Sequence, residues 1–112
     1  MIVVTTADVA GHRIVETLGL VRGSSVRARH LGQDVVAELR NLAGGEIPEY
    51  TKILAETREQ AIDRMVEEAR ALGADAVVTV RFESAEVTSG AAEMCCYGTA
   101  VRLERVEGAT GR

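Results

Sequence analysis

A helix that runs directly into a buried strand is the strongest signal in this sequence, and it spans residues 49–80. Pro48 suits the first turn, where its missing N–H has no helical partner to lose, and Gly73 is expected to end the helix. Apolar and small side chains recur at intervals of three and four and predict one broad apolar face. They are Tyr50, Leu54, Thr57, Ala61, Met65, Ala69 and Leu72.

The opposite side of this helix carries four carboxylates, and their spacing makes neighbours repel weakly. We expect solvent or a basic partner to cover them. A pair of carboxylates that works in acid–base catalysis needs burial to separate the two pKa values, and this stripe is predicted to be exposed. Its members are Glu56, Glu59, Asp63 and Glu67.

The first half of the chain predicts short strands broken by glycines. Gly11, Gly19 and Gly23 indicate bends or a close approach of two backbones, and Gly44 with Gly45 is expected to end a short helix. The expected elements are a strand at 2–6, a turn at 8–12, strand segments at 13–18 and 20–29, and the short helix at 31–43.

A hairpin is predicted at the C-terminal end, with strands at 76–87 and 92–106 joined by a turn at 88–90. Val78, Val80 and Phe82 alternate with polar residues and are expected to share one face. Both faces of the hairpin's first half are apolar or small, which indicates that each face is covered. The fold class is therefore α+β, an antiparallel sheet with a short and a long helix inserted between N-terminal strands and the hairpin.

Length and charge bound the function. With 112 residues the chain fits one domain, expected at 1–106 with a flexible tail at 107–112.

Its net charge of −4 argues against general nucleic-acid binding. With one Phe, two Tyr and no Trp, an aromatic sandwich for a flavin or nucleobase is disfavoured. No run approaches the ~18 apolar residues of a membrane span, and we expect a cytoplasmic protein.

Two adjacent cysteines, Cys95 and Cys96, are expected to be free thiols because a bridge between neighbours is strained. With Met94 they form a soft-ligand group for a thiophilic ion. However, neighbouring strand residues point to opposite faces, so both sulfurs reach one ion only if the strand bulges. The alternative reading is two small buried side chains. A ring of subunits offers a third arrangement, with one cysteine per subunit near the axis.

His30 and Asp34 are four residues apart, and on a helix they share a face as paired metal ligands do. They are our candidate ligands for a divalent metal ion. Arg27, Arg29 and His30 form a candidate anion-binding patch on an otherwise acidic chain. The alternative is that Asp34 caps a helix N-terminus, with the basic residues as local counter-ions.

Arg81, Glu93 and Tyr97 lie on the predicted hairpin and are further candidates for ligand binding. Arg81 and Glu93 flank the turn on opposite arms and are expected to pair across the strands, with the Tyr97 hydroxyl nearby. The alternative is a polar cluster that lines a pocket between subunits.

Several blocks in order resemble a known family. They are Val26-Arg27-Ala28-Arg29-His30-Leu31-Gly32-Gln33-Asp34, Leu39-Arg40-Asn41-Leu42-Ala43-Gly44-Gly45-Glu46, Tyr50-Thr51, Leu72-Gly73-Ala74-Asp75-Ala76-Val77, Arg81-Phe82, Gly90-Ala91-Ala92-Glu93 and Tyr97-Gly98-Thr99-Ala100-Val101. Together they resemble the YbjQ family of small prokaryotic proteins, over residues 1–104.

The resemblance implies an α+β subunit of the dodecin-like type, assembled as a homopentameric ring and binding heavy metals. Two positions depart from the family pattern. His12 stands where an aromatic Tyr is usual, and Cys95-Cys96 stand where apolar or small residues are usual. A metal site built on the cysteines would therefore belong to this protein rather than to the family.

Two functions compete. One is a non-enzymatic, ring-forming domain that binds a metal ion or a small anion, and the other is a structural oligomer that serves as a scaffold or partner-binding ring. An enzyme ranks third, because no Ser, Cys or Lys has a recognisable base or oxyanion loop beside it in sequence.

Overall fold

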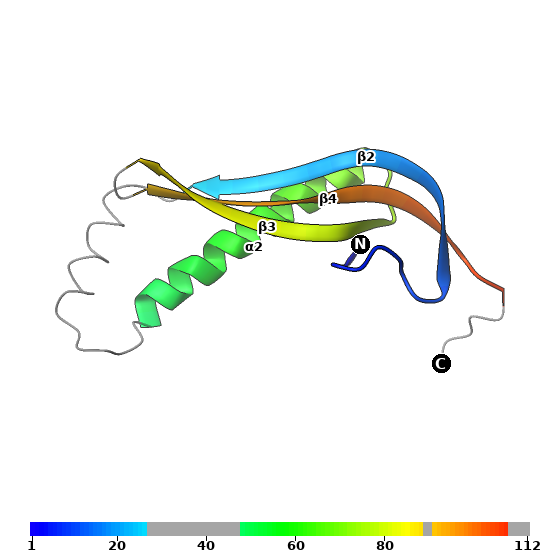
Figure 1. The fold of residues 1–112 in the computed structure, drawn as a ribbon, viewed down its shortest axis with the longest axis horizontal. Coiled ribbons are helices and arrows are strands. Elements are labelled where there is room, and N and C mark those ends of the chain that lie inside the picture. The colour runs from blue at the N-terminus through cyan, green and yellow to red at the C-terminus, as the bar shows by residue number, and fades with distance from the viewer. Residues whose placement is uncertain (27–47, 89–90, 108–112) are drawn as a thin grey trace.

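The computed structural model describes residues 1–26, 48–88 and 91–107. One helix lies along one face of a four-stranded sheet (Figure 1). The elements are β1 (Ile2–Val3), β2 (His12–Val26), α2 (Pro48–Ala71), β3 (Ala76–Thr88) and β4 (Ala91–Arg105), and the strand order is β1-β3-β4-β2. The α+β class and the β3–β4 hairpin are confirmed. The predicted helix at 31–43 and the end of the predicted tail, 108–112, lie outside the described residues.

The sheet is mixed rather than antiparallel throughout. β1 runs parallel to β3, with Ile2 opposite Ala76 and Val3 opposite Val77, whereas β4 is antiparallel to both β2 and β3. β1 joins the sheet beside β3 because the chain that follows it crosses to the far edge before entering β2 (Figure 1). A direct hairpin between the first two strands would have given the expected antiparallel pairing.

β2 is one strand of 15 residues, not the two segments that the glycines predicted. The pairing with β4 shifts register between Thr17 and Gly19, and Gly19 has φ 130°. The break expected at Gly19 is therefore a bulge, which bends a strand without ending it.

Helix α2 begins at Pro48, as predicted, and ends in a left-handed glycine turn. Gly73 has φ 79°, its N–H donates to the Arg70 carbonyl at 2.9 Å, and the Ala74 N–H donates to the Ala69 carbonyl at 3.1 Å. This pair of bonds is the Schellman motif, which satisfies carbonyls that the last helical turn leaves without partners.

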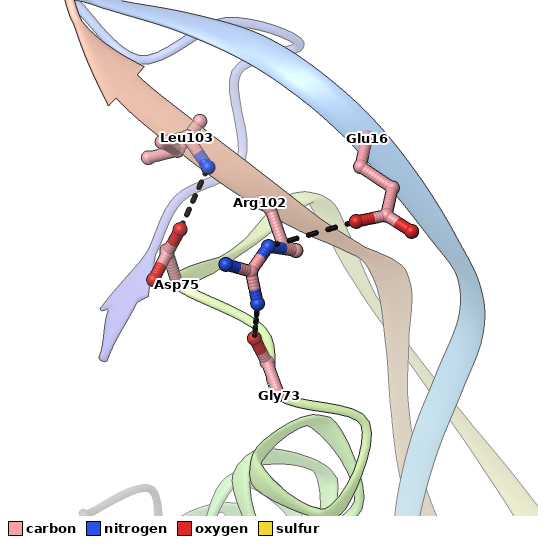
Figure 2. A network of polar contacts seen from close by, with 5 residues as sticks. All are labelled: Glu16, Gly73, Asp75, Arg102 and Leu103. Atoms are coloured by element: carbon pink, nitrogen blue, oxygen red, sulfur yellow. Dashed lines mark hydrogen bonds and ion pairs between the residues drawn. The ribbon is translucent and has the colours of Figure 1, made fainter.

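Asp75 then fixes the helix exit to the sheet (Figure 2). Its carboxylate accepts a hydrogen bond from the Leu103 N–H at 2.8 Å, and its own N–H donates to the Val101 carbonyl at 2.9 Å. Arg102 spans the same corner, with Nη1 donating to the Gly73 carbonyl at 3.3 Å and Nε 3.5 Å from a Glu16 carboxylate oxygen. The start of β3 is thereby held against β4 in one register.

The main core lies between α2 and the sheet. Small side chains bring the helix close to the strands, and nearly all of this cluster is inaccessible to solvent, which is where most of the hydrophobic stabilisation arises. Its buried members are Val21, Ala61, Met65, Ala69, Val77, Val80, Cys96 and Ala100. The predicted helical face is confirmed at Thr57, Ala61, Met65 and Ala69, whereas Leu72 is 46% exposed.

A bulge in β3 overturns the predicted alternation of Val78 and Val80. Val80 belongs to the core under α2, whereas Val78 belongs to a second cluster on the opposite face with Ala76 and Val101. Between them Thr79 has φ 54°, rare for a β-branched residue. The register with β4 shifts between Val78 and Arg81. One extra residue in β3 therefore turns the side chains after it to the other face.

The second cluster is covered by the N-terminal segment, and Val4 and Val9 pack against it. Farther along the hairpin this cover ends, and Arg81, Glu83 and Ala85 are exposed. The expectation that both faces of the hairpin are covered therefore holds only near β1. We call the side of the sheet away from α2 the outer face.

Candidate functional site

Six polar or reactive side chains gather on the outer face of β2, β4 and β3. The register places Tyr97 opposite both Arg22 and Arg81, and Cys95 opposite Ser24 and Glu83. Residues opposite each other in an antiparallel pair share a face, and residues two apart on one strand do so too. The outer-face cluster consists of Arg22, Arg81, Glu83, Glu93, Cys95 and Tyr97.

The predicted pairing of Arg81 with Glu93 is wrong. Ala85 lies opposite Glu93, four residues along β3 from Arg81. The Arg81 Nη1 donates instead to the Thr5 carbonyl at 3.0 Å and to the Val80 carbonyl at 2.9 Å. A side chain that reached Glu93 could not hold the N-terminal segment in this way. Arg81 therefore fastens that segment over the bulge.

Tyr97 stands at the centre of the outer-face cluster. Its hydroxyl donates to Glu83 at 3.4 Å, a long hydrogen bond. Two guanidinium groups, Arg22 and Arg81, come from the strands on either side. Tyr97 therefore stands on the strand between two arginine-bearing strands, on a face that also carries the carboxylates of Glu83 and Glu93.

The two cysteines diverge, as the strand period requires. Both are free thiols, as predicted, with Cys95 half-buried and Cys96 fully buried under α2. β4 pairs without interruption from Met94 to Tyr97, so no bulge brings the sulfurs together. The reading of Cys96 as a small buried side chain is confirmed. The Cys96 Sγ lies 3.8 Å from the Met65 Sδ.

Burial raises the pKa of both thiols. For Cys95 the negative charges of Glu93 and Glu83 add to the increase, and the Arg22 guanidinium opposes it. For Cys96 the neighbouring Cys95 adds to the increase, and a backbone hydrogen bond from Gly23 opposes it. Both thiols are therefore protonated at neutral pH and are weak nucleophiles.

The candidate ligands Arg27, Arg29, His30 and Asp34 lie outside the described residues. Their segment begins one residue after Val26, the last residue of β2. Val26 lies opposite Glu93 on β4. Val26, the last described residue before that segment, therefore stands at the Glu93 end of the outer-face cluster.

The carboxylate stripe of α2 is exposed at Glu56, Glu59, Asp63 and Glu67, as predicted. Within residues 1–26, 48–88 and 91–107, no three His, Cys, Asp or Glu side chains come together as a metal ion requires. Over the same ranges, no helix combines the length and apolar character needed to cross a membrane.

Sequence reasoning missed Arg22 and Glu83 as members of the outer-face cluster. Both stood on predicted strands, but their neighbours across the sheet depend on the register. Arg22 lies opposite Tyr97 because β2 shifts register against β4 between Ile14 and Glu16 and again between Thr17 and Gly19. Arg81 lies opposite Tyr97 because of the bulge at Thr79. A bulge that involves threonine leaves no clear signal in a single sequence.

Comparison with known proteins identifies the family. Residues 1–104 match the YbjQ family model, described as "putative heavy-metal-binding". A UPF0145 protein of Thermus thermophilus is 57% identical over 93% of this chain and 91% of its own length. A UPF0145 protein of the archaeon Methanosarcina acetivorans is 54% identical over 92% of this chain and 97% of its own.

The fold also matches a solved structure. A crystal structure of a Pediococcus pentosaceus protein of unknown function, from the DUF74 family, aligns with a TM-score of 0.62. The alignment covers 93% of this chain and 98% of that one at 18% identity, and at this identity it supports the fold only. The match over nearly all of the chain and the identity to the UPF0145 proteins lead to one conclusion: this chain belongs to the YbjQ family.

Proposed function

We propose that the chain is the subunit of a ring-forming homo-oligomer that binds a divalent metal ion or a small anion without catalysing a reaction. The observation that carries this proposal is the position of the outer-face cluster. Arg22, Arg81 and Tyr97 share one face, and the segment that holds His30 starts at the end of that face. The family description points to metal ions.

The ligand groups suit either kind of ion. A neutral imidazole and a carboxylate, His30 and Asp34, are ligands for borderline divalent ions such as Zn²⁺. Arg27 and Arg29 with Arg22 supply guanidinium groups that bind phosphate through paired N–H donors. Protonation of His30 below its reference pKa of ~6.5 favours the anion over the metal.

Calorimetric titration tests the site. With the intact protein we expect heat on addition of zinc chloride or sodium phosphate, and loss of that heat in His30→Ala. The chain has two histidines, so His12→Ala is the matched control. The His12 Nδ1 lies 3.0 Å from the Ala10 carbonyl, in the turn before β2. A double variant, Cys95→Ser with Cys96→Ser, is expected to keep the zinc and phosphate signals.

Each outcome has a meaning. Equal loss in both histidine variants would show that the signal depends on histidine content rather than on this site. Loss in the cysteine variant alone would move the site to the hairpin. Silence in every titration would favour the scaffold. That second function has its own support, because Arg81 and Tyr97 already bond within the chain, to Thr5 and Glu83.

The shape of the subunit supports assembly into a ring. Its extents are 58 × 28 × 16 Å and its radius of gyration is 18.0 Å, against about 13 Å for a compact chain of this length. Large apolar side chains remain in solvent on the sheet, with Leu20 64% exposed and Val26 54% exposed. A five-membered ring repeats one heterologous interface that buries such side chains.

Light scattering at micromolar concentration measures the assembly. Five chains of 12.0 kDa give a mass of about 60 kDa. Among the large apolar side chains whose exposure the structure describes, Leu20 is the most exposed on the sheet, so Leu20→Asp is expected to lower the mass toward the single chain. Lys52→Glu, an exposed charge reversal on α2, is the control and is expected to leave the mass unchanged. A mass near 12 kDa for the unmodified protein would rule out the oligomer, and a stable dimer would rule out only the pentamer.

A further inference from the structure

Along its second half, β3 is an uncovered edge of the sheet. Near the start of the strand, β1 pairs with residues 76–77, and the N-terminal segment accepts hydrogen bonds from the N–H groups of residues 79–80 (Figure 1). From Arg81 onward, the only strand beside β3 in the described part of the chain is β4. The residues from Arg81 to Ala85 are all exposed. One side of this stretch therefore has no strand next to it among the described residues.

Hydrogen bonds elsewhere in the sheet show which backbone groups of this stretch face outward. On β2, the Arg22 N–H donates to a carboxylate of α2 at 3.2 Å, so the Arg22 backbone does not bond to its β4 partner Tyr97. Bonded and non-bonded residue pairs alternate in an antiparallel ladder, so Tyr97 directs its N–H and C=O to Arg81 on the other side. The next residue of β3, Phe82, then directs its N–H and C=O away from β4, and so does Ser84.

The Val80 N–H gives the same result independently. It donates away from β4, to the Val4 carbonyl at 3.0 Å, and residues two apart on a strand direct their backbone groups to the same side. Phe82, Ser84 and Glu86 therefore line the edge with N–H donors and C=O acceptors that no described strand meets. Such a row of backbone groups is a template for a further strand.

The other long edge of the sheet decides what that further strand can be. On β2, the Arg22 N–H and the Ser24 carbonyl already bond to side chains of α2. On β3 there is neither a lysine nor a proline, the residues that commonly prevent strand addition at an edge. Of these two edges, a second copy of the chain can therefore offer only its own β3. Two copies of one strand that meet through the same edge are related by a two-fold axis and run antiparallel.

We propose that two chains of this protein join through the second half of β3, antiparallel and related by a two-fold axis at Ser84. The outward N–H and C=O groups of each chain then pair with those of the other. Ser84 meets Ser84 of the second chain, and Phe82 meets residue 86 on each side of the axis. Glu83 lies opposite Ala85 of the second chain, so the register avoids like charges directly opposite each other, which destabilise a sheet.

The ends of the uncovered stretch fix this register. A pairing centred on Phe82 would place the second chain beside Val80, whose N–H already donates to Val4. A pairing centred farther along the strand would need the backbone at Thr88, where the register of β3 with β4 is already irregular. The centre at Ser84 uses all of the outward groups between these limits.

This contact goes beyond the proposed ring. It is isologous and closes at two chains, whereas a five-membered ring repeats a heterologous contact, and it uses neither Leu20 nor His30. A pairing this short buries far less than the ~1,000 Å² of a stable interface. It therefore forms at high protein concentration and does not change the mass that light scattering measures at micromolar concentration.

Disulfide trapping tests the register. Residues opposite each other in a bonded antiparallel pair have Cα atoms about 5.5 Å apart, inside the ~4.4–6.8 Å range of disulfides. In a Cys95→Ser background at high concentration, Ser84→Cys with oxidised glutathione is expected to give a linked dimer of two 12.0 kDa chains. Ala85→Cys, also at an exposed position, is the matched control. Its two copies would lie diagonally, about 7–8 Å apart, and we expect severalfold less dimer.

A second substitution tests whether the edge itself makes the contact. Phe82→Pro removes an outward N–H, a loss that an edge strand tolerates, and combined with Ser84→Cys it is expected to abolish most of the linked dimer. Phe82→Lys replaces it if proline prevents folding. Leu20→Asp combined with Ser84→Cys is expected to keep the linked dimer, so failure of the ring and failure of this contact are distinguishable. No dimer in Ser84→Cys, as much dimer in Ala85→Cys, or undiminished dimer with the Phe82 substitutions would each overturn the proposal.

Discussion

Gly23→Ala is expected to destabilise the protein by about 4 kcal/mol, near the upper end for a single substitution. Gly23 is buried where β2 passes beneath α2. An alanine Cβ there would overlap the Ala61 carbonyl oxygen and the Met65 amide nitrogen, and it would lie 2.9 Å from the Arg64 Cβ. Because the first two atoms belong to the helix backbone, no change of side-chain rotamer relieves the overlap, and α2 must move off the sheet.

Urea denaturation at a fixed chain concentration measures this loss, since any assembly makes the midpoint depend on concentration. Gly19→Ala is the control on the same strand. At Gly19 nothing lies within 4 Å of the added Cβ, but φ is 130°. Backbone conformation alone is expected to contribute about 1–2 kcal/mol there. Equal losses in the two variants would contradict the close approach at Gly23.

Met65→Ala is expected to reduce the free energy of unfolding by about 3 kcal/mol, because it leaves a cavity at the centre of the core. Met65 has no solvent exposure and is the largest of the fully buried side chains described. It touches Cys96 from the helix side, at the crossing of α2 and β4. The surrounding side chains are mostly Ala and Val, too short to fill the space by changing rotamer.

Met65→Leu separates the effect of lost side-chain volume from the effect of losing the thioether sulfur. Leucine occupies a similar volume, and such exchanges usually cost less than about 1.5 kcal/mol. The same urea titration should therefore rank the two variants clearly. A loss for leucine as large as that for alanine would mean that the shape or the sulfur of methionine, rather than its volume, stabilises this crossing.

Much of the fold follows from local sequence chemistry. Pro48 and Gly73 set the two ends of helix α2 through their own backbone conformation, and the apolar repeat between them is long enough to define one apolar helical face. The period-2 pattern of β4 predicted which face each residue from Met94 to Leu103 takes. Between these residues the register with β3 shifts once, and the extra residue belongs to β3 rather than to β4. Local signals suffice where a strand is regular.

The rest depended on contacts between distant residues. The parallel pairing of β1 follows from the path that the chain takes across the sheet, and the bulge at Thr79 follows from its contact with the N-terminal segment. The Thr79 N–H donates to the Thr6 carbonyl at 2.9 Å, and the Val80 N–H donates to the Val4 carbonyl at 3.0 Å. Neither partner is marked in sequence by a residue type, so period alone placed Val78 and Val80 on one face, whereas they lie on opposite faces.

The candidate site, too, was predictable from sequence only in part. Arg81, Glu93 and Tyr97 do lie on one face, as strand alternation indicated, but Arg81 pairs with the backbone of Thr5 rather than with Glu93. The block from Leu72 to Val77, which carried much of the resemblance, is explained by the fold. Gly73 ends the helix and Asp75 fastens β3 to β4. Residues shared across a family can therefore mark a corner of the fold rather than a binding site.

Side chains of helix α2 also bond to the backbone of β2, the strand at one edge of the sheet. β2 is a terminal strand, and the Glu68 carboxylate accepts from the Arg22 N–H at 3.2 Å while the Arg64 guanidinium donates to the Ser24 carbonyl at 2.5 Å. Both groups belong to the edge, where a foreign strand would otherwise add. Side chains one turn apart on α2 thus occupy the backbone positions that strand-to-strand polymerisation requires. A second chain that paired with the middle of β2 would therefore first have to displace the Glu68 and Arg64 side chains from Arg22 and Ser24.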